Sequence, residues 1–154
     1  MTRPTQETDI AVRARPAIRW ILAALYGVAG LAHFTETDRF LLIVPSWVPE
    51  ARLVVQATGF CEIAGAAALL IPKLRRGAGL MLALYALCVL PANIKHAVQG
   101  VSVPGLPDSW WYHGPRLAFQ PVLIWLALYS SQVLDWPFHA RIGRTQAPGH
   151  SELP

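Results

Sequence analysis

Residues 53–71 carry the stretch that decides the fold, LVVQATGFCEIAGAAALLI. The stretch lies between Arg52 and Pro72 and is close to the ~20 residues that an α-helix needs to cross the hydrocarbon core of a bilayer. Glu62 falls near its middle. A carboxylate at that depth is costly to keep, so an ionisable residue inside a membrane helix marks a candidate functional site.

Three more apolar segments, at 16–34, 77–96 and 115–134, have a similar length. Residues of the AVILMFWYC group make up 54% of the chain and charged residues only 14%, against about 25% charged in soluble domains. Backbone groups in lipid must be hydrogen-bonded within their own segment, so each segment is predicted to be a helix. The predicted fold is all-α: a transmembrane four-helix bundle at 16–136, between tails at 1–15 and 137–154. Pro16 stands at a favoured first helical position.

The loops after the first and third predicted helices lie on the side of the membrane opposite the two tails, and they are longer than the loop after the second helix. In the first, residues 35–51, Thr35 and Asp38 precede the apolar run Phe40 to Val44, and Pro45 ends any helix. This run is too short to span, so we expect a short interfacial or re-entrant segment. The other loop, residues 97–114, carries aromatic residues typical of the headgroup level, and the fourth helix is expected to begin near Pro115.

The distribution of Lys and Arg predicts the orientation. One side of the predicted bundle holds nine of these residues and the other holds four, Arg39, Arg52, Lys95 and Arg116. The positive-inside rule then places both termini in the cytoplasm of a bacterial inner membrane. The partner implied by composition is the lipid bilayer. No Lys/Arg run with interleaved aromatic residues indicates nucleic-acid binding.

Polar residues recur on the predicted helices at spacings of three and four, which places them on single faces. Lipid disfavours such faces, so they should point inward and form a pocket in the outer half of the bundle. Glu62 is the candidate catalytic residue, and the candidate ligand-binding residues are His33, Asn93, His96, Arg116 and Gln120.

Several interpretations of these residues stay open. Glu62 and Arg116 are either a fold-locking ion pair or part of a ligand or proton site, and the charge of Glu62 is undetermined. His33, Glu62 and His96 suit Zn or non-haem Fe, but they lack a local ligand motif, so no metal ligand is assigned. Cys61 and Cys88 lie at similar predicted depths and could pair, although no C-x-x-C motif is present.

Short motifs along residues 16–130 resemble the DoxX family of small four-helix membrane proteins. They are His33-Phe34, Phe40 to Pro45 with Pro49, Gly59 to Ile63 with Gly65, Leu69 to Pro72 with Arg75, Pro91 to Ile94, and Arg116 to Gln120, where Ala118 departs from the family's usual proline. The resemblance implies an association with thiosulfate:quinone oxidoreduction or with membrane complexes that handle oxidative stress. A more distant relative is a chaperone.

The leading functional hypothesis is therefore a small-molecule or quinone-binding subunit of a membrane redox system, an oxidoreductase subunit if it takes part in chemistry. Its candidate cofactor is a quinone, and its candidate protein partners are a membrane redox protein or a second copy of the chain. The alternative is a non-enzymatic assembly factor or chaperone in which the polar cluster is structural. A metal-dependent membrane enzyme is a weaker alternative.

Overall fold

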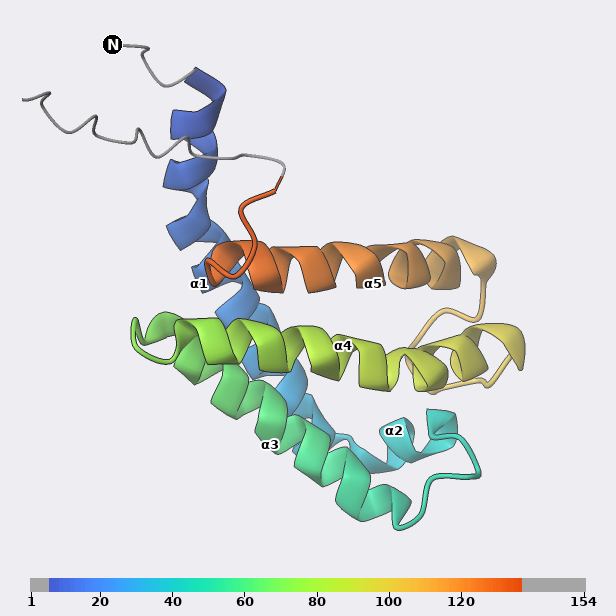
Figure 1. Ribbon diagram of the computed structural model, residues 1–154. Helices are drawn as coiled ribbons and strands as arrows, with labels where there is room; N and C mark the ends of the chain where they lie inside the picture. The colour runs from blue at the N-terminus through green and yellow to red at the C-terminus, as the bar shows by residue number, and fades with distance from the viewer. Residues whose placement is uncertain (1–5, 137–154) are drawn as a thin grey trace, which may run out of the picture.

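The computed structural model describes residues 6–136, with side chains from residue 13 onward. This part of the chain forms five helices and no strand: α1 (Gln6–Thr35), α2 (Thr37–Ile43), α3 (Ala51–Leu70), α4 (Arg75–Val98) and α5 (Trp110–Ser130), shown in Figure 1. The prediction of an all-helical chain is confirmed. The expected C-terminal tail, residues 137–154, lies outside the described residues.

Two helices begin earlier than the sequence pattern predicts. Helix α1 already contains Pro16, which is therefore not its first residue. Helix α5 begins at Trp110 and contains Pro115. Its first turn closes because the backbone N–H groups of Tyr112 and His113 both donate to the carbonyl of Ser109, at 2.9 and 3.0 Å. The expectation of a loop up to Gly114 was wrong for this reason.

Three of the described helices are long and apolar enough to cross a membrane, at Arg13–Thr35, Ala51–Leu70 and Arg75–Val98. Helix α5 is not among them, because Arg116, Gln120 and two prolines lower its mean hydropathy. Many large apolar side chains are exposed along the helices, among them Trp20, Val28, Leu31, Phe60, Leu80, Leu84 and Leu87. A water-soluble monomer rarely exposes so much contiguous apolar surface, so the chain is a membrane protein.

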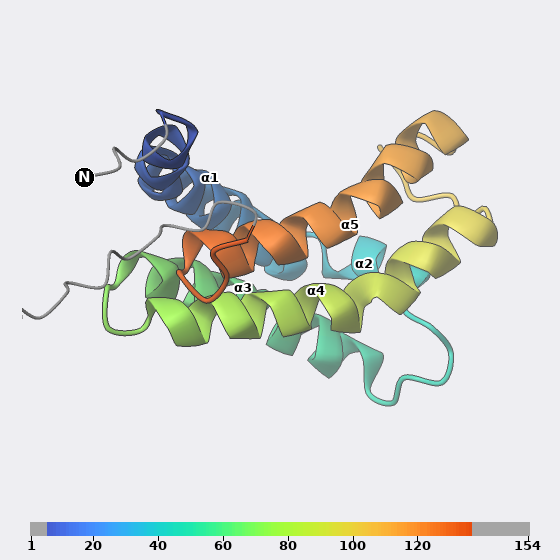
Figure 2. The same ribbon diagram turned by 45° about the horizontal axis from the view of Figure 1, so that its top comes forward.

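The helices pack as two crossing pairs. Helix α1 lies along α3, helix α4 lies along α5, and α3 also contacts α4 (Figures 1 and 2). A small apolar core joins α1, α3, α4 and α5 and contains Leu22, Tyr26, Ala66, Leu69, Leu82 and Ala127. The beginning of α4 and the end of α5 lie on the left of Figure 1, where α5 contacts α1, and α2 lies toward the opposite end.

Helix α2 is held against its neighbours by polar contacts. The ammonium group of Lys95 donates to the carbonyls of Leu42 and Val44, at 3.1 and 2.6 Å. Arg52 at the start of α3 pairs with Asp38 at 2.5 Å. These contacts place the short helix across one end of the molecule, where it covers the site described next.

Candidate functional site

A partly open cavity of about 540 Å³ lies between the helices at the end of the molecule that carries α2. All five helices contribute to its lining, together with Val44, Pro45, Trp47 and Val48. Most of the lining is apolar, and the volume falls within the ~300–1,000 Å³ usual for small-molecule sites. Of the six residues predicted from sequence, five line this cavity: His33, Glu62, Asn93, Arg116 and Gln120.

Glu62 is buried in the cavity wall, with only 4% of its surface exposed. Tyr85 of α4 makes a side-chain hydrogen bond with its carboxylate. Its Oε2 atom lies 3.5 Å from Nε2 of His33 and has no hydrogen-bond partner among the described residues. Leaving a carboxylate oxygen buried without a full set of partners is costly, so this atom is available to a ligand or a proton.

The contacts of the other ring nitrogen, Nδ1, determine which nitrogen of a neutral His33 carries the hydrogen. Nδ1 lies 2.8 Å from the carbonyl oxygen of Val55 and 3.0 Å from the hydroxyl of Thr58. Because a carbonyl can only accept, Nδ1 carries the hydrogen, and Nε2 of a neutral His33 is an acceptor that faces Glu62. Two acceptors face each other favourably only if a proton lies on one of them. The two atoms are 3.5 Å apart and are not hydrogen-bonded to each other, so an acceptor nitrogen of His33 lies beside an unpartnered carboxylate oxygen of Glu62.

Close packing of α1 on α3 brings this pair together. A Cβ atom placed on Gly59 would lie 2.5 Å from Cβ of His33 and 2.9 Å from the carbonyl oxygen of Gly30. A Cβ on Gly30 would lie 2.7 Å from the carbonyl oxygen of Gly59. Small residues let membrane helices approach in this way, so the two glycines set the His33–Glu62 distance.

Tyr26 was not among the predicted site residues. Its ring lines the cavity, its hydroxyl is buried without a hydrogen-bond partner in the described part of the chain, and it lies within electrostatic range of Glu62. It also contacts Tyr85 edge to face, with 6.2 Å between ring centroids. The signal was present in the sequence, because Tyr26 falls on the same face of its helix as His33.

A second polar cluster surrounds Arg116 on α5. Its Nη2 donates to the side-chain oxygen of Asn93, and its Nη1 lies 2.7 Å from Nδ1 of His96. Because a guanidinium only donates, Nδ1 of His96 accepts, and the hydrogen of a neutral His96 is on Nε2. His96 is 1% exposed and lies behind Arg116 rather than in the cavity lining. It orients Arg116 and is not placed to touch a ligand there.

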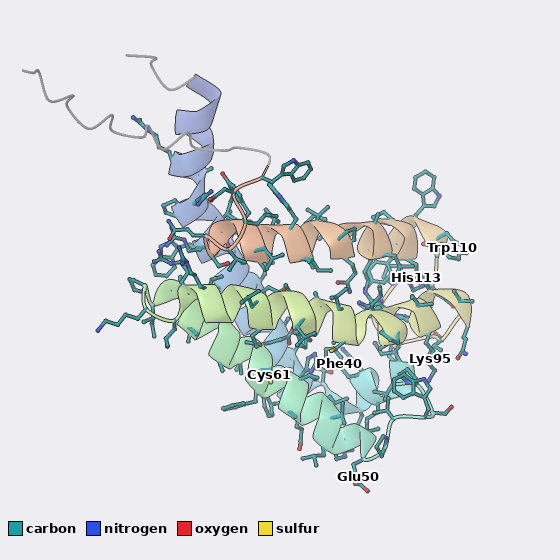
Figure 3. All side chains as sticks on the ribbon, viewed as in Figure 1. Phe40, Glu50, Cys61, Lys95, Trp110 and His113 are labelled. Atoms are coloured by element: carbon teal, nitrogen blue, oxygen red, sulfur yellow. The ribbon has the colours of Figure 1, made fainter. Side chains whose placement is uncertain are left out.

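His113 belongs to this second cluster, although the sequence suggested a loop residue. It lies in the first turn of α5, between α5 and α4 (Figure 3), and is 2% exposed. Its ring centroid is 4.6 Å from that of His96, and its Nε2 is 3.7 Å from a carboxylate oxygen of Asp108. If the helix start at Trp110 had been predicted, the three-residue spacing from His113 to Arg116 would have placed both side chains on one helix face and indicated that His113 belongs to this cluster.

The two clusters are separate. No ion pair joins Glu62 to Arg116, both of which are described residues. The fold-locking ion pair, one of the two interpretations left open by the sequence, is therefore absent from this arrangement, and each group has different partners. His33 with Glu62 and His96 with Arg116 lie on different parts of the site, so the three candidate metal ligands are not brought together. Within residues 6–136, no group of three or more His, Cys, Asp or Glu side chains could hold a metal ion.

Cys61 and Cys88 are free and exposed. The suggested pairing between them is not formed. Cys88 nevertheless lies at the edge of the cavity lining.

Comparison with known protein families gives one match, over residues 22–131, to a model described as "Domain of unknown function (DUF8561)". The chain belongs to the DUF8561 family. The DUF8561 region runs from the middle of α1 to the residue after α5 and includes both polar clusters and the whole cavity lining. Searches of curated proteins and of solved structures find no match. The resemblance to DoxX proteins stays a prediction.

Proposed function

We propose that this DUF8561 protein is a membrane-embedded binding subunit for a small, mainly apolar molecule with polar carbonyl groups, the class that includes quinones. The observation that carries the proposal is the pair of unpartnered polar atoms at the cavity, the hydroxyl of Tyr26 and Oε2 of Glu62. Buried polar atoms are normally paired, and an unpaired one calls for an explanation such as a ligand. The DoxX-like motifs point to the same class.

The polar groups of the cavity suit such a molecule. Arg116, Gln120 and the Tyr26 hydroxyl are donors, and carbonyl oxygens are acceptors. The apolar remainder of the lining suits a ring and a hydrocarbon chain. Glu62 lies in the cavity wall beside the acceptor nitrogen of His33, so Glu62 is the residue that would accept or pass a proton if the bound molecule is reduced. Electrons would come from a membrane redox partner.

The proposed setting is a four-helix transmembrane bundle in the bacterial inner membrane, with both termini in the cytoplasm. Helix α5 is the fourth span, since it lies along α4 for its length. Helix α2 is the interfacial segment. The aromatic side chains of Trp47, which follows α2, and of Trp110 and Trp111 at the start of α5 are exposed, as expected at the headgroup level.

Native mass spectrometry of the full-length protein, released from its own membranes in mild detergent, tests the proposal. We expect an added mass that organic extraction identifies as a quinone or a similar carbonyl compound. Tyr26→Phe removes one unpaired hydroxyl and keeps the ring, so it should leave stability unchanged and lower ligand occupancy. Glu62→Gln should lower occupancy as well, whereas Glu50→Gln at the residue before α3, where the carboxylate is exposed, should not.

A protein that never carries a small molecule, or that binds it equally well in Tyr26→Phe and Glu62→Gln, would refute this proposal. Co-purification with a protein partner alone would favour the second candidate function, a membrane assembly factor or chaperone. The exposed tryptophans around the cavity end are the observation behind that candidate. In that case Glu62→Gln would change stability but not partner binding.

A further inference from the structure

Three arginines lie near one another at the end of the molecule opposite the cavity. Arg15 and Arg19 come from α1, and Arg75 is the first residue of α4. Arg19 lies within electrostatic range of both other guanidinium groups, and its Nε donates to the carbonyl of Arg15 at 3.4 Å. Figure 1 shows the start of α4 and the end of α5 on the same side of the molecule, where α5 contacts α1. The site is distinct from the cavity.

The described chain supplies too little negative charge for this cluster. Arg15 is only 7% exposed, packs over the ring of Tyr129 at 4.5 Å and pairs with Asp135 at 2.6 Å. The Nε atoms of Arg15 and Arg75 are nevertheless buried without a hydrogen-bond partner among the described residues. Buried charged donors without partners are strongly unfavourable, and three neighbouring cations repel one another. An anion that accepts hydrogen bonds from the arginines of both helices would supply the missing partners and reduce the repulsion between the three cations.

The surroundings indicate where that anion comes from. Trp20 and Trp136 are 66% and 60% exposed, and Nε1 of Trp125 donates to the carbonyl of Trp136 at 3.1 Å. Tryptophans of this kind mark the headgroup level of a membrane. The exposed side chains of Ile71 and Leu74 precede Arg75, so the site faces lipid as well as water.

We propose that Arg15, Arg19 and Arg75 form a binding site for the phosphate group of an anionic phospholipid. Free phosphate has the same chemistry, but the lipid-facing tryptophans and leucine favour a phosphate that carries acyl chains. The site lies on the side that the Lys/Arg distribution assigns to the cytoplasm, where anionic headgroups attract basic side chains. The proposal does not depend on what occupies the cavity.

Lipid titration of the full-length protein in detergent, followed by native mass spectrometry, tests it. The probes are dioleoylphosphatidylglycerol and dioleoylphosphatidylcholine, which differ in headgroup charge. We expect one phosphatidylglycerol molecule to bind in preference to phosphatidylcholine. Arg75→Gln and Arg19→Gln should weaken that binding about fivefold or more, the effect expected for one basic residue at a headgroup.

Arg76→Gln is the matched control, because Arg76 is the next residue on the same helix, carries the same charge and is exposed. It should change binding less than twofold. Arg75→Lys keeps the charge and should retain most of the binding, which separates loss of the site from loss of the fold. Equal losses in Arg75→Gln and Arg76→Gln, or no preference for phosphatidylglycerol, would overturn the proposal. Competition by inorganic phosphate in excess would overturn the lipid assignment in favour of the free ion.

Discussion

At the scale of single residues, hydrogen bonds assign opposite roles to the two site histidines. His33 donates through Nδ1 to a backbone carbonyl and offers Nε2 to Glu62. His96 accepts through Nδ1 from Arg116. The first histidine is therefore placed for proton exchange with a carboxylate at the cavity, and the second is a positioning residue for a guanidinium.

This difference predicts two tautomers. With ring-labelled histidine, ¹⁵N NMR of the protein in detergent should show neutral His33 with its hydrogen on Nδ1 and neutral His96 with its hydrogen on Nε2, because their Nδ1 partners are an acceptor and a donor respectively. Single His→Gln variants assign the signals. Finding the same tautomer at both positions would contradict the hydrogen bonds that place an acceptor nitrogen of His33 beside Glu62.

The two contacts of the Arg116 guanidinium predict the effect of a conservative substitution. Arg116→Lys should lower the free energy of unfolding by about 1–3 kcal/mol. A single ammonium group would replace a planar guanidinium that contacts both Asn93 and His96, and one of these two partners would be left without its hydrogen bond. Thermal unfolding in detergent measures it. Arg76→Lys, at an exposed position, serves as the control, and equal shifts in both variants would show that the Arg116 contacts contribute nothing.

At the scale of helices, the contact between α1 and α3 determines how closely His33 and Glu62 approach each other. Each of the two helices has a glycine, and so no side chain, at the crossing, where Gly30 of α1 and Gly59 of α3 face each other. The helices can then approach closely enough for His33 to reach Glu62. The distance between His33 and Glu62 is thus a property of the helix crossing, and a small change there acts on the site without altering a polar group.

Gly59→Ala should therefore be strongly unfavourable. The new methyl group would overlap Cβ of His33 and the carbonyl of Gly30, so we expect a loss of about 1–3 kcal/mol in unfolding free energy and lower ligand occupancy. Gly27→Ala is the control, since nothing lies within 4 Å of a Cβ there, and alanine is the better helix former. Unfolding midpoints in detergent compare the two. If both variants are equally stable, the close crossing is not what holds α1 on α3.

At the scale of the whole molecule, the two ends differ in chemistry. One end carries the cavity beneath α2, and the other carries the arginine cluster with its tryptophans. In the proposed topology these ends face opposite sides of the membrane. A ligand in the cavity would then be reached from the side away from the cytoplasm.

The topology can be measured by labelling with a membrane-impermeant thiol reagent in a background that lacks Cys61 and Cys88. Ser102→Cys, at the cavity end, should react in intact cells, and Arg76→Cys should react only after the membrane is permeabilised. Both positions are exposed in the structure, so burial does not explain a difference. The reverse pattern would show that the chain is inserted the other way round.

Local properties of the sequence determined the helices and the membrane setting. The length and apolarity of 53–71 predict α3 without reference to any other part of the chain, and the periodicity of Glu62, Asn93, Arg116 and Gln120 indicates which helix faces point inward. Those features depend on residues within a few turns of one another. The start of α5 escaped prediction because its first turn depends on the carbonyl of Ser109 and not on apolar periodicity.

Only the tertiary structure decided which polar groups meet. Periodicity gives the inward face of a helix but not its rotation or its offset along a neighbour, and a shift of one turn moves a side chain by about 5.4 Å. For that reason Glu62 faces His33 and Tyr85 instead of Arg116, while Arg116 binds Asn93 and His96. The proximity of Arg15, Arg19 and Arg75 likewise depends on how α1 and α4 pack around the shared apolar core.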